Sequence, residues 1–308
     1  MSTTVAIVTE PAADQPAFDQ PAFDQHRSLL FTIAYELLAS VADAEDVVQE
    51  TYLRWSARPA EVTVTNPRAY LAQITTRLSL NRLRTLARRR EDYVGPWLPE
   101  PLLTVPDIAD DVVLAESVSL ALMVVLESLG PKERAVFLLR EVFGYEHAEI
   151  AEALGMNAAA VRQTAHRAKQ HVAARRPRFE ADDQVARQLR ERFTDAVISG
   201  DVQGLMDLMA PDVVVLSDGG GRVRAARRPV QGADAASRVL IGIARKAGPG
   251  MRLEETMING APGWLAWDGE QLTAAVQLVV GADRIDQVLI MINPDKLGGL
   301  AEPRAIAR

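Results

Sequence analysis

Residues 43 to 55 read Asp43-Ala44-Glu45-Asp46-Val47-Val48-Gln49-Glu50-Thr51-Tyr52-Leu53-Arg54-Trp55. Four of them recur at the spacing of one helix face and predict a helix that packs this face inward: Ala44, Val48, Thr51 and Trp55. A second face is acidic with one apolar contact: Asp46, Gln49, Glu50 and Leu53. Asp43 is expected to be the N-cap, because a carboxylate there accepts free backbone N–H groups. On composition alone, an ordinary solvated acidic helix is the alternative.

The composition bounds the class of protein. A chain of 308 residues with 48% hydrophobic content can bury a sizeable core, and its length predicts two or three domains. The absence of cysteine excludes a disulfide framework and a thiolate metal site and fits a reducing cytoplasm. No apolar run approaches the roughly 18 residues that cross a bilayer. We therefore expect a cytoplasmic protein with no cofactor, no metal and no membrane partner.

The charge is unevenly distributed. The net charge of −7 argues against a protein that coats nucleic acid indiscriminately. Residues 77 to 90 and residues 153 to 179 nevertheless carry bases and no acid. Two basic segments on an acidic chain indicate directed contacts with phosphate.

The first half of the chain has a helical pattern on both sides of a linker. Residues 1–25 contain the repeat Pro-Ala-Phe-Asp-Gln and predict a disordered tail. Residues 26–95 are helical by period, with Asn66 and Pro67 as N-cap and first residue of a third helix. Residues 96–111 form a Pro-rich acidic linker of extended character. Helices resume over residues 112–178.

The pattern changes after Phe179. Residues 184–199 predict a helix with Gly200 as its C-terminal cap, and residues 233–246 predict another. Strands are predicted over 213–216, 251–257, 272–280 and 285–292. Residues 179–300 are therefore an α+β domain and residues 301–308 a tail, so the fold class is multidomain, two all-α domains followed by an α+β domain.

One helix after Pro67 carries a basic stripe. Its members step by four, three and four residues: Arg77, Asn81, Arg84 and Arg88. Cationic grooves of this kind hold the backbone of single-stranded nucleic acid. A solvated basic face is the alternative.

A helix-turn-helix follows the linker. Residues 146–154 predict one helix, Gly155 and Met156 the turn, and Asn157 caps a helix that runs to about residue 174. The inner face comprises Val161, Ala165, Ala168 and Val172. The outer face comprises Ala159, Arg162, Gln163, His166, Arg167 and Lys169. The N-terminal half of such a recognition helix enters the major groove, where Arg, Gln and His bond base edges or phosphates.

Taken together, these motifs resemble those of bacterial extracytoplasmic-function sigma factors. The residue 43–55 stretch resembles their D-A-E-D-x-V-Q-E-x-F-x-R motif, and Ile150 to Arg162 resembles their helix-turn-helix. Three further strings resemble the signatures of the subfamily with a fused SnoaL-like domain, to which the sigma J type belongs: Trp97-Leu98-Pro99-Glu100-Pro101, Asp218-Gly219-Gly220-Gly221-Arg222 and Asn293-Pro294-Asp295-Lys296-Leu297. The resemblance covers nearly the whole chain after residue 25.

The resemblance implies two partners, core RNA polymerase and promoter DNA. Polymerase would bind Asp43, Asp46, Gln49, Glu50 and Leu53. The −10 element would be held by Arg77, Asn81, Arg84 and Arg88, although the family often has Asp at the place of Asn81. The −35 element would be read by Ala159, Arg162, Gln163, His166, Arg167 and Lys169.

The resemblance also implies regulation in cis. The fused domain, a cone of the nuclear-transport-factor-2-like fold, would act in place of a separate anti-sigma factor, and its two motif loops would lie near the Trp97 linker. Arg222 stands where the subfamily has Lys, so the geometry of its ion pair can differ. We expect Arg222 and Lys296 to pair with Glu100 or with the acids that follow it.

Two rival functions remain open on sequence grounds. The third domain could be an enzyme, as in polyketide cyclases and ketosteroid isomerases, but it contains no His or Tyr after Phe179. Asp218 and Asp268 are better explained as turn residues, so no catalytic residue is expected. A pocket lined by Trp264, Trp267 and Met257 could bind a small apolar effector. The second rival, a regulator that binds duplex DNA without polymerase, leaves the residue 43–55 motif without a role.

Overall fold

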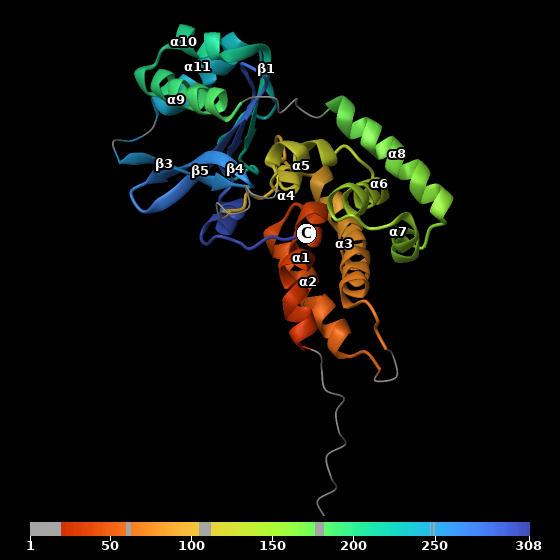
Figure 1. The fold of residues 1–308 in the computed structure, drawn as a ribbon. Helices are drawn as coiled ribbons and strands as arrows, with labels where there is room; N and C mark the ends of the chain where they lie inside the picture. Colours follow the sequence, from red (N-terminus) through yellow and green to blue (C-terminus); the bar gives the residue numbers. More distant parts are fainter. Residues whose placement is uncertain (1–19, 60–62, 105–111, 176–181, 247, 249) are drawn as a thin grey trace, which may run out of the picture.

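The computed structural model describes residues 20–59, 63–104, 112–175, 182–246, 248 and 250–308 (Figure 1). The front of the chain is helical on both sides of the linker. Before the linker lie α1 (Gln20–Leu38), α2 (Val41–Ser56) and α3 (Pro67–Glu91). After it lie α4 (Val112–Ser117), α5 (Leu120–Leu126), α6 (Pro131–Phe137) with a π turn (Leu138–Val142), α7 (His147–Leu154) and α8 (Ala158–Arg175).

The first helix begins earlier than the sequence predicts. α1 starts at Gln20, so the predicted tail of residues 1–25 is wrong for residues 20–25, while residues 1–19 lie outside the described residues. Phe23 is buried and meets Tyr52 edge-on, with ring centroids 5.1 Å apart. Burial of this aromatic ring stabilises the first turn of the helix. The prediction of a disordered tail rested on composition, which does not show this contact.

The two N-terminal caps differ in outcome. Asn66 Oδ1 accepts the N–H of Ala69 at 3.1 Å, so the predicted cap of α3 is confirmed. The cap of α2 is Ser40, whose hydroxyl accepts the N–H of Asp43 at 3.3 Å, so the prediction of Asp43 as N-cap is wrong. Asp43 lies in the first turn instead, where its carboxylate pairs with Arg82 of α3.

The remaining residues form a six-stranded sheet with helices. The elements are α9 (Asp183–Ser199), α10 (Val202–Leu208), β1 (Met209–Asp218), β2 (Val230–Gln231), α11 (Ala233–Ala244), β3 (Met251–Ile258), β4 (Ala261–Asp268), β5 (Gln271–Val280) and β6 (Ile285–Met291), followed by 3-10 turns at Pro294–Lys296 and Gly298–Leu300. The strand order is β2-β1-β6-β5-β4-β3, with β1 and β6 parallel. The α+β fold is confirmed, but β4 escaped prediction because Pro262 and Gly263 stand at its start.

The sheet has two buried faces. Alternate side chains of a strand point to opposite faces. Trp264, Val276 and Ile290 pack with the helices α9, α10 and α11 on one face. Their neighbours Leu265, Ala275 and Leu289 pack on the other face with linker residue Leu98 and with Leu120 of α5. The sheet therefore buries the linker and part of the second helical segment.

Asn259 of the sheet domain contacts the first helix, the linker and the helical segment after the linker. It sits at the β3–β4 turn with a positive φ of 50° and is fully buried. Its amide nitrogen donates to Tyr35 Oη of α1 at 2.7 Å and to the Val118 carbonyl at 2.8 Å, and its amide oxygen accepts the Leu102 N–H at 2.8 Å. An Asn-Gly pair indicates a hairpin turn in sequence; the tertiary contacts of its side chain have no sequence signal.

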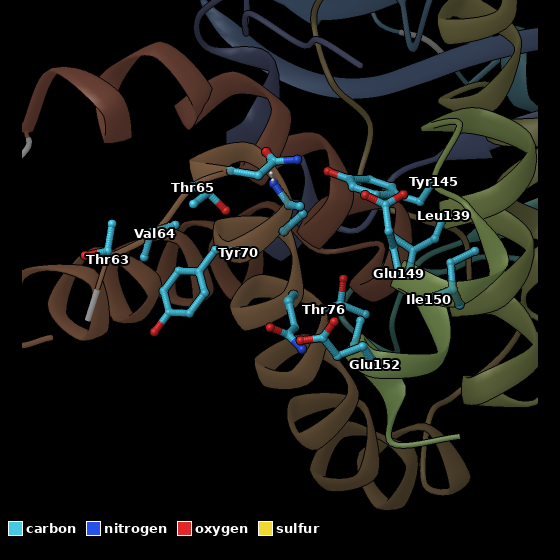
Figure 2. Close-up of a pocket in the computed structure, with 15 residues that line it drawn as sticks. Thr63, Val64, Thr65, Tyr70, Thr76, Leu139, Tyr145, Glu149, Ile150 and Glu152 are labelled. Atoms are coloured by element: carbon cyan, nitrogen blue, oxygen red, sulfur yellow. Dashed lines mark hydrogen bonds between the residues drawn. The ribbon is translucent and has the colours of Figure 1, made fainter. Parts of the chain in front are cut away.

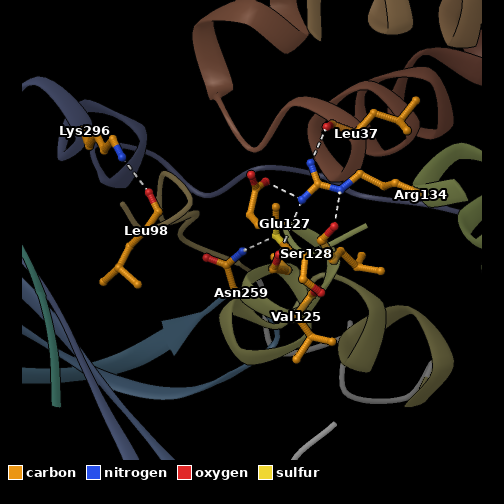
Figure 3. A network of polar contacts seen from close by, with 10 residues as sticks. Leu37, Leu98, Val125, Glu127, Ser128, Arg134, Asn259 and Lys296 are labelled. Atoms are coloured by element: carbon orange, nitrogen blue, oxygen red, sulfur yellow. Dashed lines mark hydrogen bonds and ion pairs between the residues drawn. The ribbon is translucent and has the colours of Figure 1, made fainter. Parts of the chain in front are cut away.

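A second buried polar group ties the two helical segments together. Arg134 of α6 is 3% exposed, and it donates to the Leu37 carbonyl of α1 at 2.8 Å and to the Leu126 carbonyl at 3.2 Å (Figure 3). It also forms an ion pair with Glu127. The helices before and after the linker consequently share one hydrophobic core.

Glu36 of α1 is buried inside that shared core. One carboxyl oxygen accepts the Ser117 hydroxyl at 2.6 Å, and the other has no partner among the described residues. Burial raises the pKa of Glu36 from 4.5 to about 8, against the opposing effects of the Ser117 hydrogen bond and the Arg134 charge. The folded chain therefore holds this carboxyl protonated at neutral pH.

This pKa predicts a pH-dependent stability. The unfolded chain releases the Glu36 proton above pH 4.5, whereas the folded chain retains it until about pH 8. Stability is therefore lost as pH rises through this window, by about 3 kcal/mol at pH 7, and levels off above pH 8. Urea unfolding of the full chain between pH 5 and 9 should show this loss, and Glu36→Gln should flatten it. Parallel pH profiles for the two chains would contradict the prediction.

Candidate functional site

The acidic face of α2 is open to solvent. Asp46, Gln49, Glu50 and Leu53 are all exposed, and Leu53 keeps 57% of its surface in water. Asp43 is different: its side chain is 14% exposed and accepts Arg82 Nε at 2.6 Å. Arg82 also meets Asp46 at 3.3 Å. Asp43 therefore fastens α2 to α3, while the other four residues form an exposed surface, on which Glu50 pairs with Arg54 at 2.7 Å.

The basic stripe of α3 is partly engaged inside the protein. Arg77 donates through Nε to the Ala153 carbonyl at 2.7 Å and through Nη2 to the Glu152 carbonyl at 2.9 Å. These carbonyls belong to the last turn of α7, where a cation complements the helix dipole. Asn81 accepts Arg84 at 3.0 Å, and the side chain of Arg88 lies outside the described residues.

A pocket of about 340 Å³ lies between α3 and α7 (Figure 2). One wall comes from the start of α3 and the loop before it, with Tyr70, Gln73 and Thr76. The facing wall comes from the π turn, the loop after it and α7 and includes Glu149 and Glu152. Sequence reasoning missed this pocket because its walls are about 75 residues apart, as the Arg77 contact with Glu152 shows.

The outer face of α8 is exposed throughout. It comprises Ala159, Arg162, Gln163, His166, Arg167 and Lys169. Lys169 pairs with Glu141 at 2.7 Å, and Arg167 lies 3.9 Å from Glu133. Exposed pairs of this kind contribute little stability, so they leave the bases available to a polyanion. The predicted inner face of Val161, Ala165, Ala168 and Val172 is buried, as expected.

The two motif loops of the sheet domain meet at the linker. We call the contact of Asp218, Lys296 and Leu98 the linker lock. Lys296 Nζ donates to Asp218 Oδ2 at 2.8 Å and to the Leu98 carbonyl at 2.6 Å, and the same carboxylate oxygen accepts the Leu98 N–H at 2.8 Å. The ammonium lies 4.1 Å from the Trp97 ring centroid. Asp218 is fully buried and Lys296 is 8% exposed.

These contacts correct two expectations. Asp218 ends β1 as a buried acceptor, also taking the Tyr93 hydroxyl at 2.6 Å, and is more than a turn residue. Lys296 pairs with Asp218 and Arg222 pairs with Asp295 at 3.0 Å, in place of the predicted pairing with Glu100, and the acids that follow Glu100 in the linker lie outside the described residues. The Asp218 carboxylate is fully buried and needs a cation beside it, and the Lys296 ammonium lies 2.8 Å from it.

Other motif residues build the frame of the lock. Glu100 Oε2 accepts the Val41 N–H at 2.6 Å at the start of α2, and burial raises the pKa of Glu100. Asn293 Oδ1 accepts the Asp295 N–H at 3.1 Å and so caps the Pro294 turn. A Cβ on Gly220 would lie 2.2 Å from Asn293 Nδ2, which explains a glycine there. Gly219, Gly221 and Leu297 complete the same contact region.

The last residues also bind the helical segments. Arg304 forms an ion pair with Glu45 of α2, and its backbone N–H donates to the Leu103 carbonyl at 2.9 Å. The Ala307 N–H donates to the Thr32 hydroxyl of α1 at 3.0 Å, and Ile306 is buried in the shared core. Residues 301–308, expected to be a tail, therefore pack against α1 and α2.

The sheet domain contains a cavity, but its lining differs from that of the predicted effector pocket. A cavity of about 450 Å³ lies in the sheet domain and is lined by Trp264. Trp267 and Met257 are not part of it. Trp267 faces the opposite side of β4, where the Arg252 guanidinium lies 4.7 Å from its ring centroid. Within the described segments, no helix is long and apolar enough to span a bilayer.

Comparison with known proteins identifies the class. Residues 22–89 match the family model Sigma-70 region 2, and residues 119–172 match Sigma-70, region 4. These units define a sigma factor, the subunit that directs RNA polymerase to promoters. The chain is 37% identical to the extracytoplasmic-function sigma factor SigJ of Mycobacterium tuberculosis, over 91% of this chain and 94% of that protein. It is 29% identical to the probable sigma factor SigI of the same species, over 89% and 93%.

The fold agrees over the same length. The crystal structure of M. tuberculosis SigJ superposes with a TM-score of 0.74 at 34% identity, covering 92% of this chain and 99% of that one. The chain therefore belongs to the extracytoplasmic-function RNA polymerase sigma factors and is SigJ-like, with a fused SnoaL-like domain. It acts in promoter-specific transcription initiation and, like these relatives, is not an enzyme.

The linker lock predicts unequal costs for two ion pairs. Lys296→Met leaves Asp218 buried without its cation and should lower the free energy of unfolding by about 3–5 kcal/mol. Arg222→Met breaks an exposed pair and should cost about 1 kcal/mol or less. Chemical denaturation of both variants measures the difference. Equal costs would show that the lock contributes no more than a surface pair.

Proposed function

We propose that this sigma factor regulates itself by closing. In the closed arrangement, region 4 covers the surface of region 2 that would engage the −10 element, and the SnoaL-like domain holds the two regions together. The observation that carries the proposal is the contact of Arg77 with the last turn of α7. A base that would hold promoter DNA is bound to backbone carbonyls of the region that would read the −35 element.

The pocket beside Arg77 supports the same conclusion. Its α7 wall presents Glu149 and Glu152 toward the loop and helix that would receive an unpaired strand. Phosphates carry negative charge, so these carboxylates repel a strand that enters the pocket. Region 4 must move away before the strand can bind.

The spacing of promoter elements also requires opening. The −10 and −35 elements are about 25 base pairs apart, or roughly 85 Å at about 3.4 Å per base pair. α3 has 25 residues and is about 38 Å long, and α7 packs directly against it. Two DNA-binding faces held this close cannot reach both elements together, so the closed chain would engage one element at most.

The SnoaL-like domain supplies the closing contacts. Its sheet buries Leu98, its Asn259 joins α1 to the residues after the linker, and its motif loops form the linker lock. Through these contacts the chain carries its own inhibitor, and a separate anti-sigma factor is not required. Release of the linker would free both regions.

In this scheme the three surfaces act one after another. Asp46, Gln49, Glu50 and Leu53 are exposed in the closed chain and would bind core polymerase first. The α8 face around Arg162 and Gln163 is also exposed and would read the −35 element. Arg77, Asn81, Arg84 and Arg88 would engage the −10 element only after opening. The structural units in this scheme are residues 26–95, 112–178 and 179–300.

Weakening the closed state should raise transcription. Asn259→Gly removes a buried side chain but keeps the positive φ that the turn requires. Loss of its hydrogen bonds should shift the equilibrium toward open by about 2–3 kcal/mol, and run-off transcription with core polymerase should rise about tenfold or more. Asp268→Gly, at the exposed end of β4, is the matched control. Equal transcription from the two variants would contradict closure as the inhibited state.

The polymerase surface can be tested by charge reversal. Asp46→Arg with Glu50→Arg places two like charges opposite a basic partner and should abolish pull-down of core polymerase. The double variant Glu191→Arg with Asp195→Arg has the same spacing on exposed α9 and should bind normally. Circular dichroism checks that both chains fold. Undiminished binding of the Asp46 and Glu50 variant would remove this face from the proposal.

A further inference from the structure

The cavity of the SnoaL-like domain is open to solvent and apolar. Its volume is about 450 Å³, within the roughly 300–1,000 Å³ of small-molecule sites. The strands β3, β4, β5 and β6 form one wall and α9 with α11 the other. Four of the eight large hydrophobic side chains exposed in the described parts of the chain line it: Val223, Ile243, Met251 and Leu253. Exposed apolar side chains gathered at one cavity mark a binding site.

The lining defines the chemistry of a ligand. Among the described residues that line the cavity, none carries a charge at neutral pH. Phe193 of α9 and Trp264 of β4 stack with ring centroids 6.1 Å apart and planes inclined by 25°, so both walls contribute an aromatic ring to the lining. The hydroxyls of Thr194 and Thr273 already donate to the Arg190 and Ala266 carbonyls. A charged ligand would lose its hydration without gaining a partner, so the cavity favours a neutral molecule with a planar ring.

The cavity shares a wall with the linker lock. Leu297 lines the cavity and also packs in the cluster that buries Leu98 on the other side. Pro294 lines the cavity and begins the turn that carries Lys296, whose ammonium holds the Leu98 carbonyl at 2.6 Å. A molecule in the cavity would therefore contact the back of the residues that hold the linker.

We propose that the cavity binds a neutral, ring-containing apolar molecule and that its occupancy strengthens the linker lock. The ligand adds dispersion contacts to Pro294 and Leu297 in the positions they hold when the linker is bound, so it binds the closed state better than the open one. Its consequence for transcription rests on the proposed function: such a molecule acts as a corepressor, and its loss favours opening.

The binding test uses the neutral fluorophore N-phenyl-1-naphthylamine with the full chain. Ala274→Phe fills the cavity from β5, and Ala274→Ser is the matched control that leaves it open. Saturable binding should persist in the Ser variant and fall at least tenfold in the Phe variant. Ile243→Trp, at the exposed mouth, should weaken binding even if the Phe variant folds poorly. Equal affinity in the wild-type chain and the two bulky variants would overturn the site.

The coupling test measures cleavage of the linker by chymotrypsin after Trp97. A ligand that binds only the closed state at ten times its dissociation constant should slow cleavage about tenfold. Cleavage at an unchanged rate under saturation would overturn the coupling. Transcription in the presence of the fluorophore separates this inference from the proposed function. Slower cleavage with unchanged transcription would retain the ligand site and refute the closed state as the inhibited one.

Discussion

The burial of Asp218 beside Lys296 is the constraint on which the arrangement of this protein depends. A buried carboxylate is stable only with a cation and hydrogen-bond donors around it, and here the donors are Lys296, the Leu98 and Gly220 backbone N–H groups and the Tyr93 hydroxyl. Two of these four, Tyr93 and Leu98, lie at the end of region 2 and at the start of the linker. The SnoaL-like domain therefore completes its own polar core only while it holds the linker, which couples its folding to the position of the sigma regions.

The sheet makes this coupling possible because both of its faces are packed against other parts of the chain. One face packs against α9 to α11 and encloses a cavity, while the other buries Leu98 and Leu120. Adjacent residues such as Trp264 and Leu265 point to opposite faces. A shift of the strand on the cavity side therefore also moves side chains that pack against the linker. An interdomain interface and a ligand cavity thus share the same strands.

In the proposed mechanism, competition within the chain silences the sigma factor and leaves the proposed polymerase surface open. Arg77, which is proposed to hold promoter phosphate, donates to α7 carbonyls instead, and the Glu149 and Glu152 carboxylates line the adjoining pocket. The acidic face of α2 stays exposed. The closed state in this proposal controls promoter engagement, a later step than the first contact with polymerase.

Elements whose signals are local could be predicted from the amino-acid sequence alone. The inward face of α2, the Asn66 cap, the helix-turn-helix and the α+β character of the last domain follow from periodicity and capping, which act over a few residues. The partners of Lys296, the burial of Glu36, the contacts of Asn259 and those of Arg77 became visible only in the folded chain. Each of these contacts joins residues roughly 75 to 225 positions apart, and the pairing depends on which surfaces the packed domains bring together.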